Sequence, residues 1–278
     1  MIDKAALPKD SASVLIIRDG AAHARHGTLQ ILMVKRHKNM RFAGGAYVFP
    51  GGKLDPADRA FEEDEQRKAL PEINEEINEE INPEFRGLRY AALREAFEET
   101  GLIIGRIDGQ KIGEDRRKAV DEKYRARVLD GSISLAEFLS KSGIALDVKD
   151  CIPFAHWITP KAYSMRFDTR FFLCVAPAGQ VPSPDGHEIT EVEWMYPMTL
   201  VEESDGILMF PTMMNLKKLG QAKSVAEALN LLAKRDIVTV MPEVVTGDKA
   251  RFRKIPETAG YDDVDQSRTR AAIDLEKG

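Results

Sequence analysis

The sequence predicts an α+β fold in which a central mixed β-sheet lies between layers of helices, as an α/β/α sandwich. Apolar, strand-like stretches occur both before and after a single acidic helix, which we expect between about Tyr90 and Gly101. Further stretches with helical character follow, where they can cover the second face of the sheet. The composition, 43% hydrophobic and 31% charged residues, is ordinary for a globular protein. We therefore interpret residues 1–278 as a single domain with two additions and a tail.

The first strands are predicted by two apolar stretches, Ser13–Arg18 and Leu29–Lys35, which are separated by a polar turn around Asp19–Gly20. A third stretch, Ala46–Asp55, has the pattern of a short strand that runs into a turn at Gly51–Gly52. Since glycine has no side chain, the backbone of this turn can approach a ligand closely.

A polar insertion, at about residues 59–87, separates this turn from the acidic helix. Within it, Ile73, Ile77 and Ile81 recur every four residues, so they would lie along one face of a helix that Pro83 ends. We expect an inserted lid that docks through these isoleucines. Its acidic residues are expected to form a solvated outer face.

The second addition is a helical elaboration at about residues 106–150. Asp115–Leu129 has helical character, and Ser134 is expected to cap a following helix, because Glu137 stands three positions later.

The remaining elements are apolar strands and helical stretches. They are strands at Ile152–Ile158, Arg170–Val175 and Val192–Tyr196, helices at Thr199–Glu203, Thr212–Leu219 and Ser224–Lys234, and a last edge strand at Ile237–Met241. From Thr246 the chain becomes polar, so we expect residues 246–278 to be a loosely held tail.

Charge and composition disfavour several classes of function. The net charge of −5 disfavours a nucleic-acid-binding protein, which usually needs a basic surface. No apolar run approaches the ~18 residues of a membrane span. The start, Met1–Lys4, lacks a signal-peptide pattern, so we expect a cytoplasmic protein. Cys151 and Cys174 stand in apolar stretches and are expected to be buried free thiols rather than a disulfide.

The acidic helix carries the strongest chemical signal. Glu95, Glu98 and Glu99 stand at positions i, i+3 and i+4, which places them within a sector roughly 100° wide. Like charges this close destabilise a helix, and a bound divalent cation removes that penalty. Hard oxygen ligands suit Mg²⁺ or Mn²⁺, so we predict that the three glutamates bind metal. The alternative is a solvated acidic face.

The stretch Arg94–Leu102 resembles the second half of the Nudix box, whose pattern is G-x5-E-x7-R-E-U-x-E-E-x-G-U with U apolar. It matches at every defined position. The first half matches at Gly52, but Asp58 stands where the family has Glu. Arg94 follows Gly52 by 42 positions instead of the family's 14, an excess of 28 that falls in the insertion. Long loops are tolerated because closure entropy grows slowly with length.

A split box of this kind resembles one Nudix branch, the coenzyme A diphosphatases. Three further stretches point the same way: Trp157–Pro160, Arg166–Phe172 and Glu191–Trp194. The resemblance implies a metal-dependent pyrophosphohydrolase of a small nucleoside diphosphate derivative, here coenzyme A or acyl-CoA. ADP-ribose, NADH and dinucleoside polyphosphates remain alternative substrates. The rival hypothesis is a non-catalytic Nudix module that senses a nucleotide, and the sequence leaves a homodimer open.

The resemblance also implies roles for individual residues. Arg94, Glu95, Glu98 and Glu99 form the catalytic set, in which Arg94 orients a glutamate by a bidentate contact. The general base stays open between these glutamates and the acids of a later loop, Glu188 and Glu191, while Asp55 and Asp58 are unassigned. His187 is expected to be polar filler, and His156 a core histidine. The expected substrate contacts are Arg36, Arg41, Phe42, Gly51, Gly52, Arg166, Phe167 and Arg170.

Overall fold

The computed structural model describes residues 6–40, 42–61, 87–204, 208–232, 236–246 and 251–261. The isoleucine stripe of the expected lid, the expected substrate contact Arg41 and the end of the expected tail beyond residue 261 lie outside these ranges.

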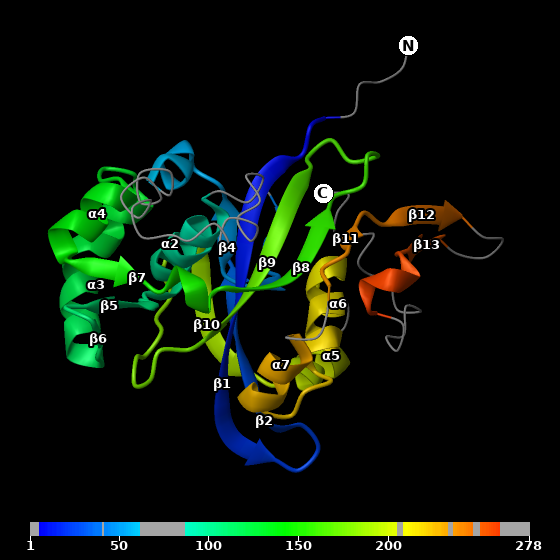
Figure 1. The fold of residues 1–278 in the computed structure, drawn as a ribbon. Helices are drawn as coiled ribbons and strands as arrows, with labels where there is room; N and C mark the ends of the chain where they lie inside the picture. The colour runs from blue at the N-terminus through cyan, green and yellow to red at the C-terminus, as the bar shows by residue number, and fades with distance from the viewer. Residues whose placement is uncertain are drawn as a thin grey trace, which may run out of the picture.

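The centre of the molecule is a mixed β-sheet, as predicted (Figure 1). Its strand order is β10 (Ile189–Met195), β2 (Gly27–Arg36), β1 (Lys9–His23), β9 (Phe167–Val175), β8 (Ile152–Ile158) and β11 (Thr239–Val240). The central pair β1–β9 and the edge pair β8–β11 are parallel, and the other pairs are antiparallel. Two short strands join the long ones: β3 (Tyr47–Val48) pairs with β2, and β4 (Gly51–Lys53) pairs with β1.

The two faces of the sheet are covered by different helices, because side chains alternate along a strand. From β1, Leu15 and Ile17 pack with α5 (Pro197–Glu203), α6 (Phe210–Leu219) and α7 (Val225–Leu232). Val14 and Ile16 point the other way and pack against α2 (Leu88–Thr100). Figure 1 shows α2 to the left of the sheet and α5–α7 to its lower right. The predicted α/β/α sandwich is therefore confirmed.

The acidic helix α2 begins after Gly87 and ends at Gly101, both of which have a left-handed backbone conformation. The Gly101 N–H donates to the Phe97 carbonyl. This is the ending that the sequence predicts, because glycine adopts this conformation without a steric cost.

The elaboration packs on the outer side of α2. It contains α3 (Glu114–Leu129), α4 (Leu135–Ser142), the small sheet β6 (Gln110–Lys111), β5 (Gly105–Ile107) and β7 (Ile144–Leu146), and the 3₁₀ turn η3 (Val148–Asp150). Phe97 of α2 stacks on Phe138 of α4, with ring centroids 5.0 Å apart. The Ser134 cap is confirmed, since its hydroxyl accepts the Glu137 N–H at 3.2 Å.

The expectation of a loose tail from residue 246 is wrong for residues 251–261. β12 (Glu243–Thr246) and β13 (Arg251–Lys254) form a hairpin, which the turn η4 (Glu257–Ala259) follows. Tyr261 is then buried, where its hydroxyl accepts from Trp157 Nε1 and donates to Asn215 Oδ1. A polar segment can be anchored by one aromatic residue, and residue composition does not report such an anchor.

Two further expectations can be compared with the structure. Cys151 and Cys174 are both buried free thiols, as expected. Within the parts of the chain that the structure describes, no helix has both the length and the apolar character needed to cross a bilayer.

Candidate active site

The glutamates of α2 lie against the Gly51–Gly52 turn. Glu99 accepts the Gly51 N–H at 2.9 Å, and both Glu98 and Glu99 are buried. Gly52 stands directly beside Glu95, because a Cβ atom at this position would lie 2.2 Å from Glu95 Oε1. The pairing of β4 with β1 holds the turn in place. The two parts of the split box therefore meet in space despite the insertion between them.

The close approach at Gly52 gives a first prediction. Gly52→Ala should displace the Glu95 carboxylate and lower kcat by about tenfold or more, because small shifts of a catalytic group are costly. Its thermal stability should fall only modestly, since the contacting atoms end a flexible side chain. Gly113→Ala is the matched control for adding a methyl group, because nothing lies within 4 Å of a Cβ there and its φ of −80° suits alanine. Diphosphatase assays beside thermal melts make the comparison, and unchanged kcat in Gly52→Ala would contradict it.

Arg94 connects the acidic groups of the site. Its Nη1 donates to Glu95 Oε1 at 3.0 Å and to Glu98 Oε1 at 2.9 Å. Its Nε and Nη2 both donate to the Asp58 carboxylate, at 3.0 Å. Nη2 also reaches the Lys53 carbonyl. Arg94 thus touches two glutamates through one nitrogen, whereas its bidentate contact is with Asp58 and not, as expected, with a glutamate.

Asp58 is the partner of Arg94 that the sequence left unassigned. Its side chain is 1% exposed, in a helical segment at residues 56–61. It also accepts the Asp55 N–H. The available signal was its position, six residues after Gly52, where the family pattern has Glu. The structure uses this acid to hold Arg94.

The acidic groups are crowded and shielded from water. Burial raises the pKa of Glu98 to about 7, and the charge of Glu95 adds to this increase. Burial raises the pKa of Glu95 despite the opposing effect of Arg94. For Glu99, burial and then the charge of Glu95 hold the pKa well above its usual range. Cations near the carboxylates would remove this electrostatic cost.

The donor set fits a hard divalent cation. Glu95 and Glu98 each give one oxygen to Arg94. Among the residues described, the second oxygen of each accepts no hydrogen bond. These carboxylates do not already converge, because within the described ranges no group of three or more His, Cys, Asp or Glu is arranged to hold a metal ion. Glu95, Glu98 and Glu99 would hold a divalent cation only after their side chains rotate toward one another.

Arg36 and Glu188 line another side of the site. Arg36, at the end of β2, has Nη1 4.0 Å from Glu99 Oε1 and Nη2 3.6 Å from Glu188 Oε2. Its Nε is buried without a hydrogen-bond acceptor among the described residues. Glu191 lies elsewhere, paired with Lys35 and Tyr47. Of the two loop acids, the structure therefore brings Glu188 to the site.

Among the other expected substrate contacts, the two phenylalanines form a pair, whereas Arg166 is used to hold the backbone. Phe42 and Phe167 lie together, with ring centroids 5.5 Å apart, and Phe42 is 38% exposed. Arg166 is buried and donates to the backbone carbonyls of Thr159 and Ala6, so it fastens the segment before β9. Arg166 itself precedes β9, which contains Arg170.

His156 is buried, as expected of a core histidine. Its Nε2 lies 2.5 Å from Asp168 Oδ1, and its Nδ1 lies 2.7 Å from Thr239 Oγ1. The imidazole thus connects β8, β9 and the edge strand β11. Arg170 stands opposite His156 in the register of β8 and β9. His187 is exposed.

Comparison with known proteins identifies the family of this chain. A family model described as the NUDT19 Nudix domain matches residues 62–213, more than half of the chain. The chain belongs to this Nudix family. This Nudix chain is 26% identical over 207 residues to "Acyl-coenzyme A diphosphatase NUDT19" of Xenopus laevis, covering 63% of the chain and 54% of that relative. The protein of the same name from Homo sapiens is 25% identical over 206 residues, covering 62% of the chain and 55% of that relative.

A solved structure shows the same Nudix fold. The crystal structure of a NUDIX hydrolase from Alicyclobacillus acidocaldarius has a TM-score of 0.60 and 27% identity, covering 81% of this chain and 96% of that one. This Nudix chain spans about half the length of the curated relatives it matches.

Proposed function

We propose that this chain hydrolyses the diphosphate linkage of coenzyme A or acyl-CoA, with Mg²⁺ or Mn²⁺ held by Glu95, Glu98 and Glu99. The products would be adenosine 3′,5′-bisphosphate and a 4′-phosphopantetheine derivative. The observation that carries the proposal is the acidic face of α2 held against the Gly51–Gly52 turn. The substrate class rests on the split box and on the names of the relatives.

An ion held by Glu95, Glu98 and Glu99 would supply positive charge for the diphosphate and would lower the pKa of a bound water. Arg36, whose Nη1 and Nη2 face Glu99 and Glu188, supplies positive charge beside the diphosphate. Arg94, which contacts one oxygen of each of Glu95 and Glu98, balances the negative charge of these two carboxylates. Glu188, which reaches the site beside Arg36, accepts a proton from the attacking water.

The aromatic pair supports a place for the nucleobase. Phe42 is partly exposed above Phe167, so an adenine ring could stack on it. Arg41 and Arg170 are the expected contacts for further phosphate groups.

Turnover of a diphosphate panel tests this proposal, with products identified by mass and with Mg²⁺, Mn²⁺ or a chelator present. Coenzyme A should give a kcat/KM about tenfold above 3′-dephospho-coenzyme A, because a charge-assisted contact to the 3′-phosphate contributes about 1.5 kcal/mol. Equal values for this pair, or faster turnover of ADP-ribose or NADH, would overturn the substrate class. Binding without turnover of any substrate would favour the non-catalytic sensor, although all three glutamates of the box's second half are present.

A further inference from the structure

Two buried arginines of α3 lie behind the catalytic helix, on the side away from the Gly51–Gly52 turn. Arg117 and Arg125 are 4% and 8% exposed. Arg125 Nε donates to the Glu98 carbonyl at 2.9 Å, and Arg117 Nη1 reaches the Gly101 carbonyl at 3.3 Å. The last carbonyls of a helix lack intrahelical partners, and cations there also complement the helix dipole. α3 therefore supplies the C-terminal cap of α2.

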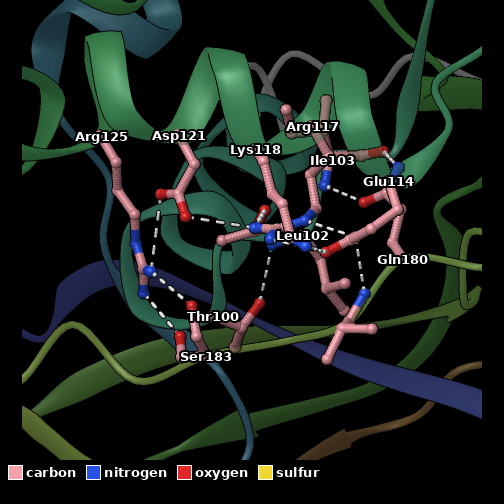
Figure 2. A network of polar contacts seen from close by, with 12 residues as sticks. Thr100, Leu102, Ile103, Glu114, Arg117, Lys118, Asp121, Arg125, Gln180 and Ser183 are labelled. Carbon is pink, nitrogen blue, oxygen red and sulfur yellow. Dashed lines mark hydrogen bonds and ion pairs between the residues drawn. The ribbon is translucent and has the colours of Figure 1, made fainter.

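Arg125 also holds a second segment of the chain. Arg125 Nη2 donates to the Ser183 carbonyl at 2.8 Å, and its Nη1 donates to the Ser183 hydroxyl at 3.1 Å. The Ser183 N–H in turn donates to the Thr100 carbonyl at 2.9 Å. Figure 2 shows this arrangement, with Arg125 reaching from α3 toward Ser183 beside Thr100. One guanidinium thus joins the end of α2 to the segment that follows β9.

Other contacts in Figure 2 fix the start of that segment. Gln180 accepts the Ile103 N–H and donates to the carbonyls of Ile103 and Ile112. Glu114, which pairs with Arg117, accepts the Val181 N–H. Gln180, Val181 and Ser183 are therefore all anchored to α3 or to the residues around the end of α2.

The anchored segment leads directly to the site. Two residues after Ser183, the Asp185 carboxylate accepts the N–H groups of His187, Glu188 and Ile189. Glu188 then faces Arg36, which lies beside Glu99. We name residues 183–189 the base loop. The rigid guanidinium of Arg125 therefore holds both Ser183, at one end of this loop, and the backbone carbonyl of Glu98.

We infer that Arg125 is a positioning residue, which sets the place of the base loop relative to the carboxylates of α2. It acts on catalysis through Ser183 and the Glu98 backbone, without touching substrate. A planar guanidinium suits this task, because its fork of donors can hold two acceptor groups at once and a lysine ammonium cannot match that geometry. The inference rests on the proposed function for its catalytic consequence.

The test compares Arg125→Ala with Tyr124→Phe. Tyr124 is the preceding residue of α3, and its hydroxyl donates to the Lys141 carbonyl, away from the base loop. With Mg²⁺ and coenzyme A, Arg125→Ala should lower kcat about tenfold to a hundredfold with little change in KM, because displaced catalytic groups are costly. Tyr124→Phe should keep its kcat. Methylguanidine, which can occupy the vacated space, should restore part of the kcat of Arg125→Ala.

A second measurement does not need activity. Hydrogen exchange of the amides of residues 187–189 should be about ten times faster or more in Arg125→Ala, because the loop loses its anchor. Wild-type kcat in folded Arg125→Ala, unchanged exchange in these amides, or no recovery with methylguanidine would each overturn the inference. If Arg125→Ala does not fold, Arg125→Lys is measured in the same two assays. Absence of turnover by the wild-type chain would instead defeat the proposed function, and the exchange experiment would still decide the inference.

Discussion

Glu99→Gln is expected to lower kcat by about two to three orders of magnitude, since under the proposed function it removes a charged ligand of a metal that would stabilise developing charge. It should also weaken Mg²⁺ binding. Glu99 is 4% exposed and bonded to the Gly51 N–H, so glutamine keeps nearly the same shape and can keep this hydrogen bond. Metal titrations and initial rates at saturating coenzyme A measure the two effects.

The stability of the same variant should move in the opposite direction. Because the pKa of Glu99 is raised in the folded chain, its favourable contribution to folding is present at acidic pH and is lost as the pH rises. Metal-free Glu99→Gln should therefore melt at or above the wild-type temperature at neutral pH. Glu122→Gln makes the same charge change at an exposed position of α3. It should alter neither kcat nor the melting temperature. Wild-type kcat in Glu99→Gln at limiting Mg²⁺ would contradict a role of Glu99 as a metal ligand.

Arg94→Gln is expected to have the largest effect on stability. It leaves Asp58, 1% exposed, without its cationic partner, and leaves Glu95 and Glu98 to repel each other. Breaking one side of such a buried pair costs about 3 kcal/mol or more, which would lower Tm by about 6 °C or more. Thermal and urea melts of the metal-free protein give the measurement.

A second substitution tests whether the unpaired Asp58 carboxylate causes the loss of stability in Arg94→Gln. Asp58→Asn removes the charge that Arg94→Gln leaves unpaired, so the double variant should lose less stability than the two single losses together. Arg25→Gln is the control, because it breaks an exposed ion pair with Glu202 that should contribute little. Strictly additive losses would mean that Arg94 and Asp58 do not act as a unit.

The parts of the fold that could be predicted are those with a local signal. The ends of α2 follow from its spacing and from Gly101, and the Ser134 cap follows from Glu137 three positions later. The unbroken apolar run Val14–Ile17 is typical of a strand with two buried faces, which β1 has. These features depend on residues within a few positions of one another, so one sequence contains the information.

The parts that could not be predicted depend on distant residues. Arg94 meets Asp58 across 36 positions, and Arg125 meets Ser183 across 58. Arg166 matches an arginine expected to bind phosphate, yet its donors are used by nearby backbone carbonyls. An arginine looks the same in sequence whether it binds a ligand or a carbonyl. Only the topology, which brings β9 beside β1, decides between these roles.

The parallel pairing of β1 with β9 also governs when this chain can fold during its synthesis. Ser11 of β1 lies beside Thr169 of β9, 158 positions later, and this pair forms the middle of the sheet. The ribosome must therefore complete more than half of the chain before the middle of the sheet can close. The face of β1 that packs with α5–α7 waits longer still, because these helices follow β9 in the chain, and such long-range closure is intrinsically slow. The apolar residues Leu15 and Ile17 are thus among the last of β1 to be covered, which favours aggregation of the incomplete chain over that of the finished one.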